Sequence, residues 1–168
     1  MSNLVATTER LHLRKMTTQD APNLLQIFSD PVAMQYYPST MNEQETVRWI
    51  QRTLDNYDTY GVGFWMVEEN ATGRFLGQCG IIPQELDGTR QMEIAYLLVR
   101  REWGNGYATE AASACKQYGF DTMGYHKLVS LIDVQNTPSM RVAERIGMRV
   151  EQTIIKWGKE VRVYSIPR

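Results

Sequence analysis

Two glycines one residue apart, Gly104 and Gly106, carry the clearest chemical signal in this chain. They stand after an apolar run and directly before a pattern typical of a helix start. Glycine permits left-handed backbone conformations and close approach to a ligand, and the free N–H groups at a helix start attract anions. The spacing therefore favours a bound phosphate or pyrophosphate. A plain turn is the alternative, because glycines after a strand are common in turns.

Other kinds of chemical site fit the sequence less well. No Gly-Lys-Ser/Thr follows the glycines, which excludes a Walker loop, and the third glycine position of a Rossmann fingerprint is Thr109 here. The two cysteines, Cys79 and Cys115, do not form a CxxC pair, and only two histidines are present. We therefore expect no metal centre and no disulfide framework.

Seven strands and four helices are expected to position the glycine loop. Apolar periodicity, turn residues and helix caps define them. The expected strands cover residues 10–14, 64–68, 75–82, 91–99, 127–134, 148–157 and 161–166, and the expected helices cover residues 17–28, 42–60, 104–120 and 138–146. A three-strand meander followed by alternating helices and strands predicts a mixed sheet with helices on its faces.

Composition limits the class of protein. A length of 168 residues with 43% hydrophobic positions suits one domain, residues 1–168. The 18 Lys and Arg against 19 Asp and Glu give a net charge of −1, which lacks the basic footprint of a nucleic-acid binder. No apolar run approaches the ~20 residues that span a bilayer, and the N-terminus lacks a signal-peptide pattern. We expect a cytoplasmic domain that binds neither nucleic acid nor membrane.

Three blocks of the sequence resemble the GNAT acetyltransferase superfamily. Arg101-x-x-Gly104-x-Gly106 matches the acetyl-CoA motif of that family, and residues 103–111 (WGNGYATEA) look like its ribosomal-protein N-terminal acetyltransferase branch. Residues 136–148 (NTPSMRVAERIGM) are similar to the Asn-x-x-Ser helix of the same branch, and residues 8–14 (TERLHLR) give a weaker third match. The resemblance covers nearly the whole chain.

The resemblance implies a particular fold and donor. The fold is a mixed, mostly antiparallel twisted sheet of about six to seven strands, with helices on both faces and a splay between the fourth and fifth strands. Acetyl-CoA is expected to lie in this splay, because parting strands leave backbone groups that the pantetheine amides can pair with. The pyrophosphate is expected on the glycine loop. The implied donor-binding residues are Leu97, Leu98, Val99, Arg101, Trp103, Gly104, Asn105, Gly106, Tyr107, Ala108, Thr109, Asn136 and Ser139.

One backbone N–H from the splayed strand polarises the thioester carbonyl in this family. The sequence leaves open which of Leu97, Leu98 and Val99 supplies it. Acyl transfer also requires removal of a proton, since a lysine-like amine with a pKa near ~10.4 is an ammonium at neutral pH. Glu93 lies where several superfamily members carry a basic glutamate, so it is expected to act as the base or to orient the acceptor. A strand-end surface charge is the alternative.

Ser139 is the candidate that protonates or hydrogen-bonds the departing thiolate. Many superfamily members use a tyrosine at the position of Ala143, so this sequence departs from that pattern, and the resembled branch uses the serine. A hydroxyl that only satisfies a helix start is the alternative. Asn136 is expected to bond the pantetheine or thiol region, with helix capping as its alternative role.

The resembled branch builds part of its acceptor pocket at the positions of Met34, Tyr36, Tyr37 and Trp65, where core packing is the alternative. The function implied is N-acetyl transfer from acetyl-CoA to a protein N-terminus or a small amine, by direct attack on the thioester. A homodimer is possible. Two other hypotheses stay open: a non-catalytic acyl-CoA sensor and a generic nucleotide-binding protein.

Overall fold

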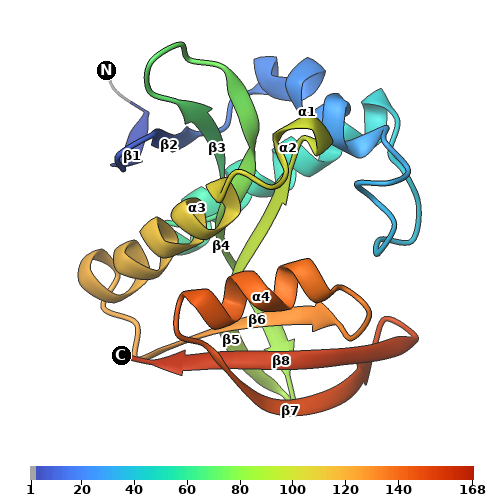
Figure 1. The fold of residues 1–168 in the computed structure, drawn as a ribbon, viewed down its shortest axis with the longest axis vertical. Coiled ribbons are helices and arrows are strands. Elements are labelled where there is room, and N and C mark those ends of the chain that lie inside the picture. Colours follow the sequence, from blue (N-terminus) through green and yellow to red (C-terminus); the bar gives the residue numbers. More distant parts are fainter. Residues whose placement is uncertain (1–2) are drawn as a thin grey trace.

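A computed structural model describes residues 3–168 as one eight-stranded sheet with helices on both faces (Figure 1). The strands are β1 (Leu4–Thr7), β2 (Leu11–Lys15), β3 (Phe64–Glu69), β4 (Phe75–Leu86), β5 (Thr89–Leu98), β6 (Lys127–Asp133), β7 (Arg149–Lys156) and β8 (Lys159–Pro167). The α-helices are α1 (Ala21–Phe28), α2 (Glu43–Tyr60), α3 (Tyr107–Gln117) and α4 (Thr137–Arg145). The mixed sheet with helices on both faces confirms the expected GNAT-type fold.

The sheet divides into two parts between β5 and β6. The strand order is β1-β2-β3-β4-β5-β6-β8-β7, and every neighbouring pair is antiparallel except β5 and β6. β4 and β5 pair along nearly their whole length, whereas β5 and β6 pair only at Glu93 and Val129. The two parallel strands part beyond this pair, which confirms the expected splay.

Local sequence signals explain where the helices begin. Asn42 caps α2 and exchanges backbone and side-chain hydrogen bonds with Glu45, and Thr17 forms the same kind of capping box with Asp20. A short 3₁₀ turn at Thr18–Asp20 precedes α1. Gly106 directly precedes α3 in a left-handed conformation with φ of 79°, which glycine adopts without strain.

The two faces of the sheet carry separate cores. On one face, apolar residues of β2 to β5 pack with α3 and α4, the two helices that lie together in Figure 1. On the other face, α1 and α2 pack against β3 and the end of β5. Each core excludes water from a large apolar surface, which stabilises the sheet on both sides. The cleft that matters for function lies where the sheet itself opens.

Several details differ from the sequence-based expectation, including the strand expected over 75–82, which extends to Leu86. β1 was not expected, because a four-residue edge strand with no buried residue gives little periodic signal. The third helix begins at Tyr107 rather than residue 104 and continues after Gln117 as a π-helical turn, Tyr118–Thr122.

Within residues 3–168, no helix is long and apolar enough to cross a membrane.

Candidate active site

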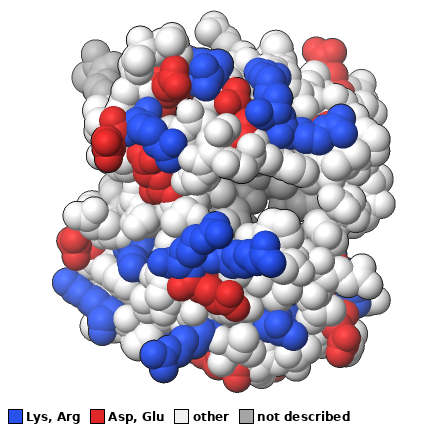
Figure 2. Space-filling model, in the orientation of Figure 1, with Lys and Arg blue, Asp and Glu red and all other residues white. Residues whose placement is uncertain are grey.

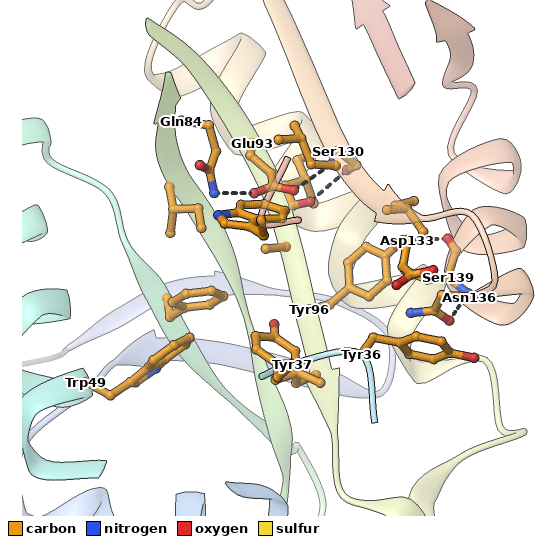
Figure 3. Close-up of a pocket in the computed structure, with 18 of the residues that line it drawn as sticks. Tyr36, Tyr37, Trp49, Gln84, Glu93, Tyr96, Ser130, Asp133, Asn136 and Ser139 are labelled. Atoms are coloured by element: carbon orange, nitrogen blue, oxygen red, sulfur yellow. Dashed lines mark hydrogen bonds between the residues drawn. The ribbon is translucent and has the colours of Figure 1, made fainter. Parts of the chain in front are cut away.

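A cleft of about 1050 Å³ opens where β5 and β6 part. Figure 2 shows a groove between the half of the molecule with α1 to α3 and the half with α4 and β6 to β8. The cleft is lined by β5, β6, the start of α4, the segment before α2, α2 itself and the turn between β7 and β8. Six expected site residues line it: Leu97, Tyr36, Tyr37, Glu93, Asn136 and Ser139. The last five are labelled in Figure 3.

The pairing of β4 with β5 decides which backbone groups face the cleft. The N–H of Val99 donates to the carbonyl of Leu76 at 2.9 Å, so Val99 turns its N–H toward β4. Backbone direction alternates along an antiparallel ladder, so Leu97 also faces β4. Tyr96 and Leu98 then point their N–H and C=O groups into the splay. Of the three residues that the sequence left open, only Leu98 can supply the backbone donor.

Two side-chain contacts agree with this assignment. The Oγ of Ser130 on β6 donates to the carbonyl of Ile94 at 2.7 Å, and the Nε1 of Trp103 donates to the carbonyl of Leu98 at 3.0 Å. Both carbonyls therefore point away from β4, as the alternation requires. The Ser130 contact also replaces a ladder hydrogen bond at the point where the strands begin to part.

Glu93 lies at the narrow end of the cleft, where β5 and β6 make their one backbone pair (Figure 3). It is 5% exposed. Its Oε1 accepts from Nε2 of Gln84 at 2.9 Å, and its Oε2 accepts from the N–H of Leu131 at 2.6 Å. Burial raises the pKa of Glu93 to about 7, although both hydrogen bonds oppose the rise. A carboxyl with this pKa can take up and release a proton near neutrality.

Ser139 and Asn136 meet at the start of α4. The Oδ1 of Asn136 accepts from the N–H of Ser139 at 3.3 Å, so the helix-capping role is present. The Oγ of Ser139 donates to the hydroxyl of Tyr96 at 3.3 Å, and that hydroxyl donates to the carbonyl of Ser139 at 2.8 Å. Burial raises the pKa of Tyr96, so its hydroxyl keeps its proton. Tyr96 is a site residue that the sequence reasoning missed.

The glycine loop lies beyond the end of β5, outside the residues that line the cleft. Gly104 and Gly106 have φ of 82° and 79°, and a Cβ at Gly104 would meet no atom within 4 Å. The loop therefore needs glycine for its conformation and leaves open space above Gly104. Ala108 and Thr109 follow Tyr107 in the first turn of α3, where backbone N–H groups have no partner within the helix.

The residues around the glycines differ in their setting. Arg101 is largely exposed, with its Nε 3.6 Å from the carboxylate of Glu102. Trp103 is 44% exposed, and Tyr107 is buried. The carbonyl of Asn105 accepts from the guanidinium of Arg10 at 2.9 Å, and this hydrogen bond joins the loop to the connection between β1 and β2.

Two of the four expected acceptor residues lie elsewhere. Trp65 is fully buried and packs edge-on against Tyr118 in the core beneath α3, with ring centroids 4.9 Å apart. Met34 is buried in the core of α1 and α2 and does not line the cleft. Successive strand residues face opposite sides of a sheet, so Phe64 reaches the cleft instead of Trp65.

The part of the cleft where the acceptor is expected is largely aromatic. Tyr36 and Tyr37 line it as expected, and Trp49, Phe64 and Trp157 complete the wall. The rings of Trp49 and Phe64 stack with centroids 5.1 Å apart. The last three residues come from α2, β3 and the turn before β8, so no single motif in the sequence marks them.

A segment before α2 spans the two sides of the cleft. The hydroxyl of Tyr36 donates to the carbonyl of Gln135 at 3.2 Å, and the Nζ of Lys159 donates to the carbonyl of Tyr36. Lys159 also pairs with Asp133 at 3.0 Å. Within residues 3–168, no group of three or more His, Cys, Asp or Glu side chains is placed to hold a metal ion.

Comparison with known proteins identifies the family. The acetyltransferase (GNAT) domain family matches residues 10–149. The uncharacterized protein YkkB of Bacillus subtilis (strain 168) is 46% identical over 159 residues, which cover 94% of this chain and 92% of YkkB. An acetyltransferase structure from Agrobacterium tumefaciens str. C58 is 31% identical with a TM-score of 0.85, over 97% of this chain and 94% of that one.

A third similar structure is RimL, a ribosomal L7/L12 alpha-N-protein acetyltransferase solved in complex with coenzyme A. It is 17% identical with a TM-score of 0.80, over 98% of this chain and 97% of RimL, and it shows a shared fold. The domain match and the relatives agree with the geometry of the splayed sheet. The chain is a member of the GNAT family of N-acetyltransferases.

Proposed function

We propose that this protein transfers the acetyl group of acetyl-CoA to a primary amine by direct attack on the thioester. The observation that carries this proposal is the buried Glu93 at the narrow end of the cleft, with a pKa raised to about 7. The amine nitrogen forms a bond to the carbonyl carbon, the carbon–sulfur bond breaks, and the amine proton passes to Glu93 directly or through a water. Positioning of the amine contributes much of the acceleration.

The donor would lie along the open edge of β5. The backbone groups of Tyr96 and Leu98 that face the splay can pair with the pantetheine amides, so the donor takes the place of a missing strand. One of the two N–H groups would stabilise the oxyanion that develops on the thioester carbonyl. The pyrophosphate would then reach the glycine loop at the start of α3. RimL, which shares the fold, is solved in complex with coenzyme A, and this supports acetyl-CoA as the donor.

Ser139 and Tyr96 together would stabilise the departing thiolate. Their hydroxyls are joined by a hydrogen bond, and the raised pKa of Tyr96 keeps that hydroxyl protonated. The hydroxyl of Ser139 can donate a hydrogen bond to the sulfur, Tyr96 holds that hydroxyl in place, and the thiolate takes its proton from solvent. The pair therefore supplies what a superfamily tyrosine at the position of Ala143 would have supplied.

Free-thiol release in the presence of different amines tests the proposal. The acceptors should include peptides with N-terminal Ala or Ser, polyamines and free amino acids, each with acetyl-CoA as donor. Transfer to peptides would favour a protein N-terminus as the acceptor, and transfer to small amines alone would favour a metabolite. Glu93→Gln should bind coenzyme A as the wild type does and lose transfer. Tight coenzyme A binding without thiol release from any amine would instead support the sensor hypothesis.

A further inference from the structure

A turn near the N-terminus reaches the glycine loop from a hundred positions away. Glu110, in the first turn of α3, accepts three hydrogen bonds from the connection between β1 and β2. Its Oε2 accepts from Oγ1 of Thr8 at 2.5 Å and from the N–H of Arg10 at 2.9 Å, and its Oε1 accepts from Nε of Arg10 at 2.7 Å. The carboxylate therefore fixes both the backbone and the side chain of Arg10.

The far end of Arg10 lies on the loop itself. Its Nη1 donates to the carbonyl of Asn105 at 2.9 Å, and its guanidinium lies 4.5 Å from the ring centroid of Tyr107. A Cβ added at Gly106 would come within 3.4 Å of its Nη2. The guanidinium thus contacts Asn105 and Tyr107, and Gly106 between them holds a left-handed conformation.

Charge gives this contact a second consequence. Glu110 is an acidic side chain in the first turn of α3, the same turn whose free N–H groups attract a phosphate. Burial alone would raise the pKa of Glu110, but the hydrogen bonds from Thr8 and Arg10 outweigh burial and lower it. Glu110 is therefore ionised at neutral pH, and the guanidinium of Arg10 balances its charge beside the loop.

We propose that Arg10, held by Glu110, is a positioning residue that keeps residues 104–107 in the conformation that receives the donor pyrophosphate. This inference rests on the proposed function, because it concerns how the same donor is bound. It assigns a role to a contact between the β1–β2 connection and α3 that lies outside the cleft.

Two donors separate this role from a general structural one. Acetyl-CoA carries the pyrophosphate, and acetyl-pantetheine lacks it but presents the same thioester. For Arg10→Ala, we expect KM for acetyl-CoA to rise about tenfold, as for loss of charged hydrogen bonds, with kcat and the kinetics of acetyl-pantetheine unchanged. Arg10→Lys keeps the charge but not the forked contacts with Glu110 and Asn105, so it should behave like Arg10→Ala.

Glu110→Gln tests the partner. Alone it should raise KM for acetyl-CoA, and combined with Arg10→Ala it should add little, because the two residues act as one unit. Arg149→Lys is the matched control, since this exposed residue begins β7 at the opposite edge of the sheet. If Arg10→Ala fails to fold, Arg10→Lys and Glu110→Gln carry the comparison.

The outcomes are distinct for the two proposals. A wild-type protein that releases thiol from neither donor contradicts the proposed function. The role of Arg10 is overturned if the wild-type protein uses both donors and the variants change the kinetics of both donors equally, or of neither. A loss confined to acetyl-CoA supports it.

Discussion

Glu93 obtains its properties from its place at the point where two strands part. Both of its oxygens hold hydrogen bonds, one from a side chain and one from the N–H of Leu131, which has lost its ladder partner in β5. Such bonds favour the carboxylate, yet burial is the larger influence and the pKa rises to about 7. Each oxygen has a second lone pair, so the carboxylate can still accept the proton of an amine.

Replacement of Glu93 tests the assignment of the base. Glu93→Gln should lower kcat/KM by about 10²- to 10⁴-fold, the usual contribution of a general base. The acceptor amine also titrates, so the ratio of wild-type to Glu93→Gln activity is the informative quantity. We expect this ratio to rise with pH up to about 7 and to level off above it, because the wild-type carboxyl is then ionised. A ratio that does not vary with pH would contradict this role.

Tyr96 and Ser139 can be distinguished by single substitutions. Tyr96→Phe removes the hydroxyl that Ser139 donates to and should reduce kcat by roughly tenfold, because the hydroxyl of Ser139 is then no longer held in place for the sulfur. Ser139→Ala should have at least as large an effect if the serine touches the sulfur. An acceptor-independent measurement, the Kd for coenzyme A, should change little in Tyr96→Phe. Activity of Tyr96→Phe equal to wild type would show that Ser139 acts alone.

At the scale of single elements, the turn between β7 and β8 combines strain with a place in the cleft. Trp157 has φ of 56° and Gly158 has φ of 74°, so a bulky side chain occupies a left-handed position. Trp157 is also 58% exposed and lines the aromatic part of the cleft, where the acceptor is expected. An aromatic residue in such a turn is unfavourable for the hairpin, where Asn-Gly is preferred.

Trp157→Asn should therefore separate stability from activity. We expect the free energy of unfolding to increase by about 1 kcal/mol, since asparagine tolerates the left-handed conformation. The KM for the acceptor should rise while the KM for acetyl-CoA stays constant, because the indole lines the part of the cleft where the acceptor is expected. Urea unfolding and steady-state kinetics measure the two effects. A variant with lower stability would contradict the strain argument, and unchanged acceptor kinetics would exclude Trp157 from acceptor binding.

Local elements were predictable wherever a short stretch of sequence determines them. The caps at Thr17 and Asn42 and the glycines of the loop follow from neighbouring residues alone. Trp65 was misplaced because a shift of one residue moves a strand side chain to the opposite face. Tyr96 was missed because its side chain lies on the opposite face of β5 from that of Glu93. The cleft passes between β5 and β6, so side chains from both faces of the sheet line it.

At the scale of the whole molecule, two half-sheets meet at a single pair of strands. β1 to β5 form one half and β6 to β8 the other, and their backbones pair only at Glu93 and Val129. Side-chain contacts such as that of Ser130 with Ile94, and the Tyr36 segment across the cleft, supplement this pair. A ligand that binds both strand edges would thus add backbone pairing across the join.

Hydrogen exchange should report this added pairing. On binding coenzyme A, the amides of Tyr96 and Leu98 should exchange more slowly, because their N–H groups face the open edge in the free protein. The amides of Leu97 and Val99 already pair with β4 and should change little. Comparable slowing at all four positions would contradict the alternation of β5. Desulfo-coenzyme A provides a second, non-reactive ligand for the same comparison.

The alternation along β5 also separates two kinds of recognition within one cleft. In the proposed mode of binding, main-chain groups of β5, which every residue type supplies, pair with the donor, whereas side chains from four different segments surround the acceptor. Replacement of Tyr37, Trp49 or Trp157 can therefore redirect the choice of amine without disturbing donor capture. A library that varies these three positions should yield enzymes that use new acceptors and keep the same KM for acetyl-CoA.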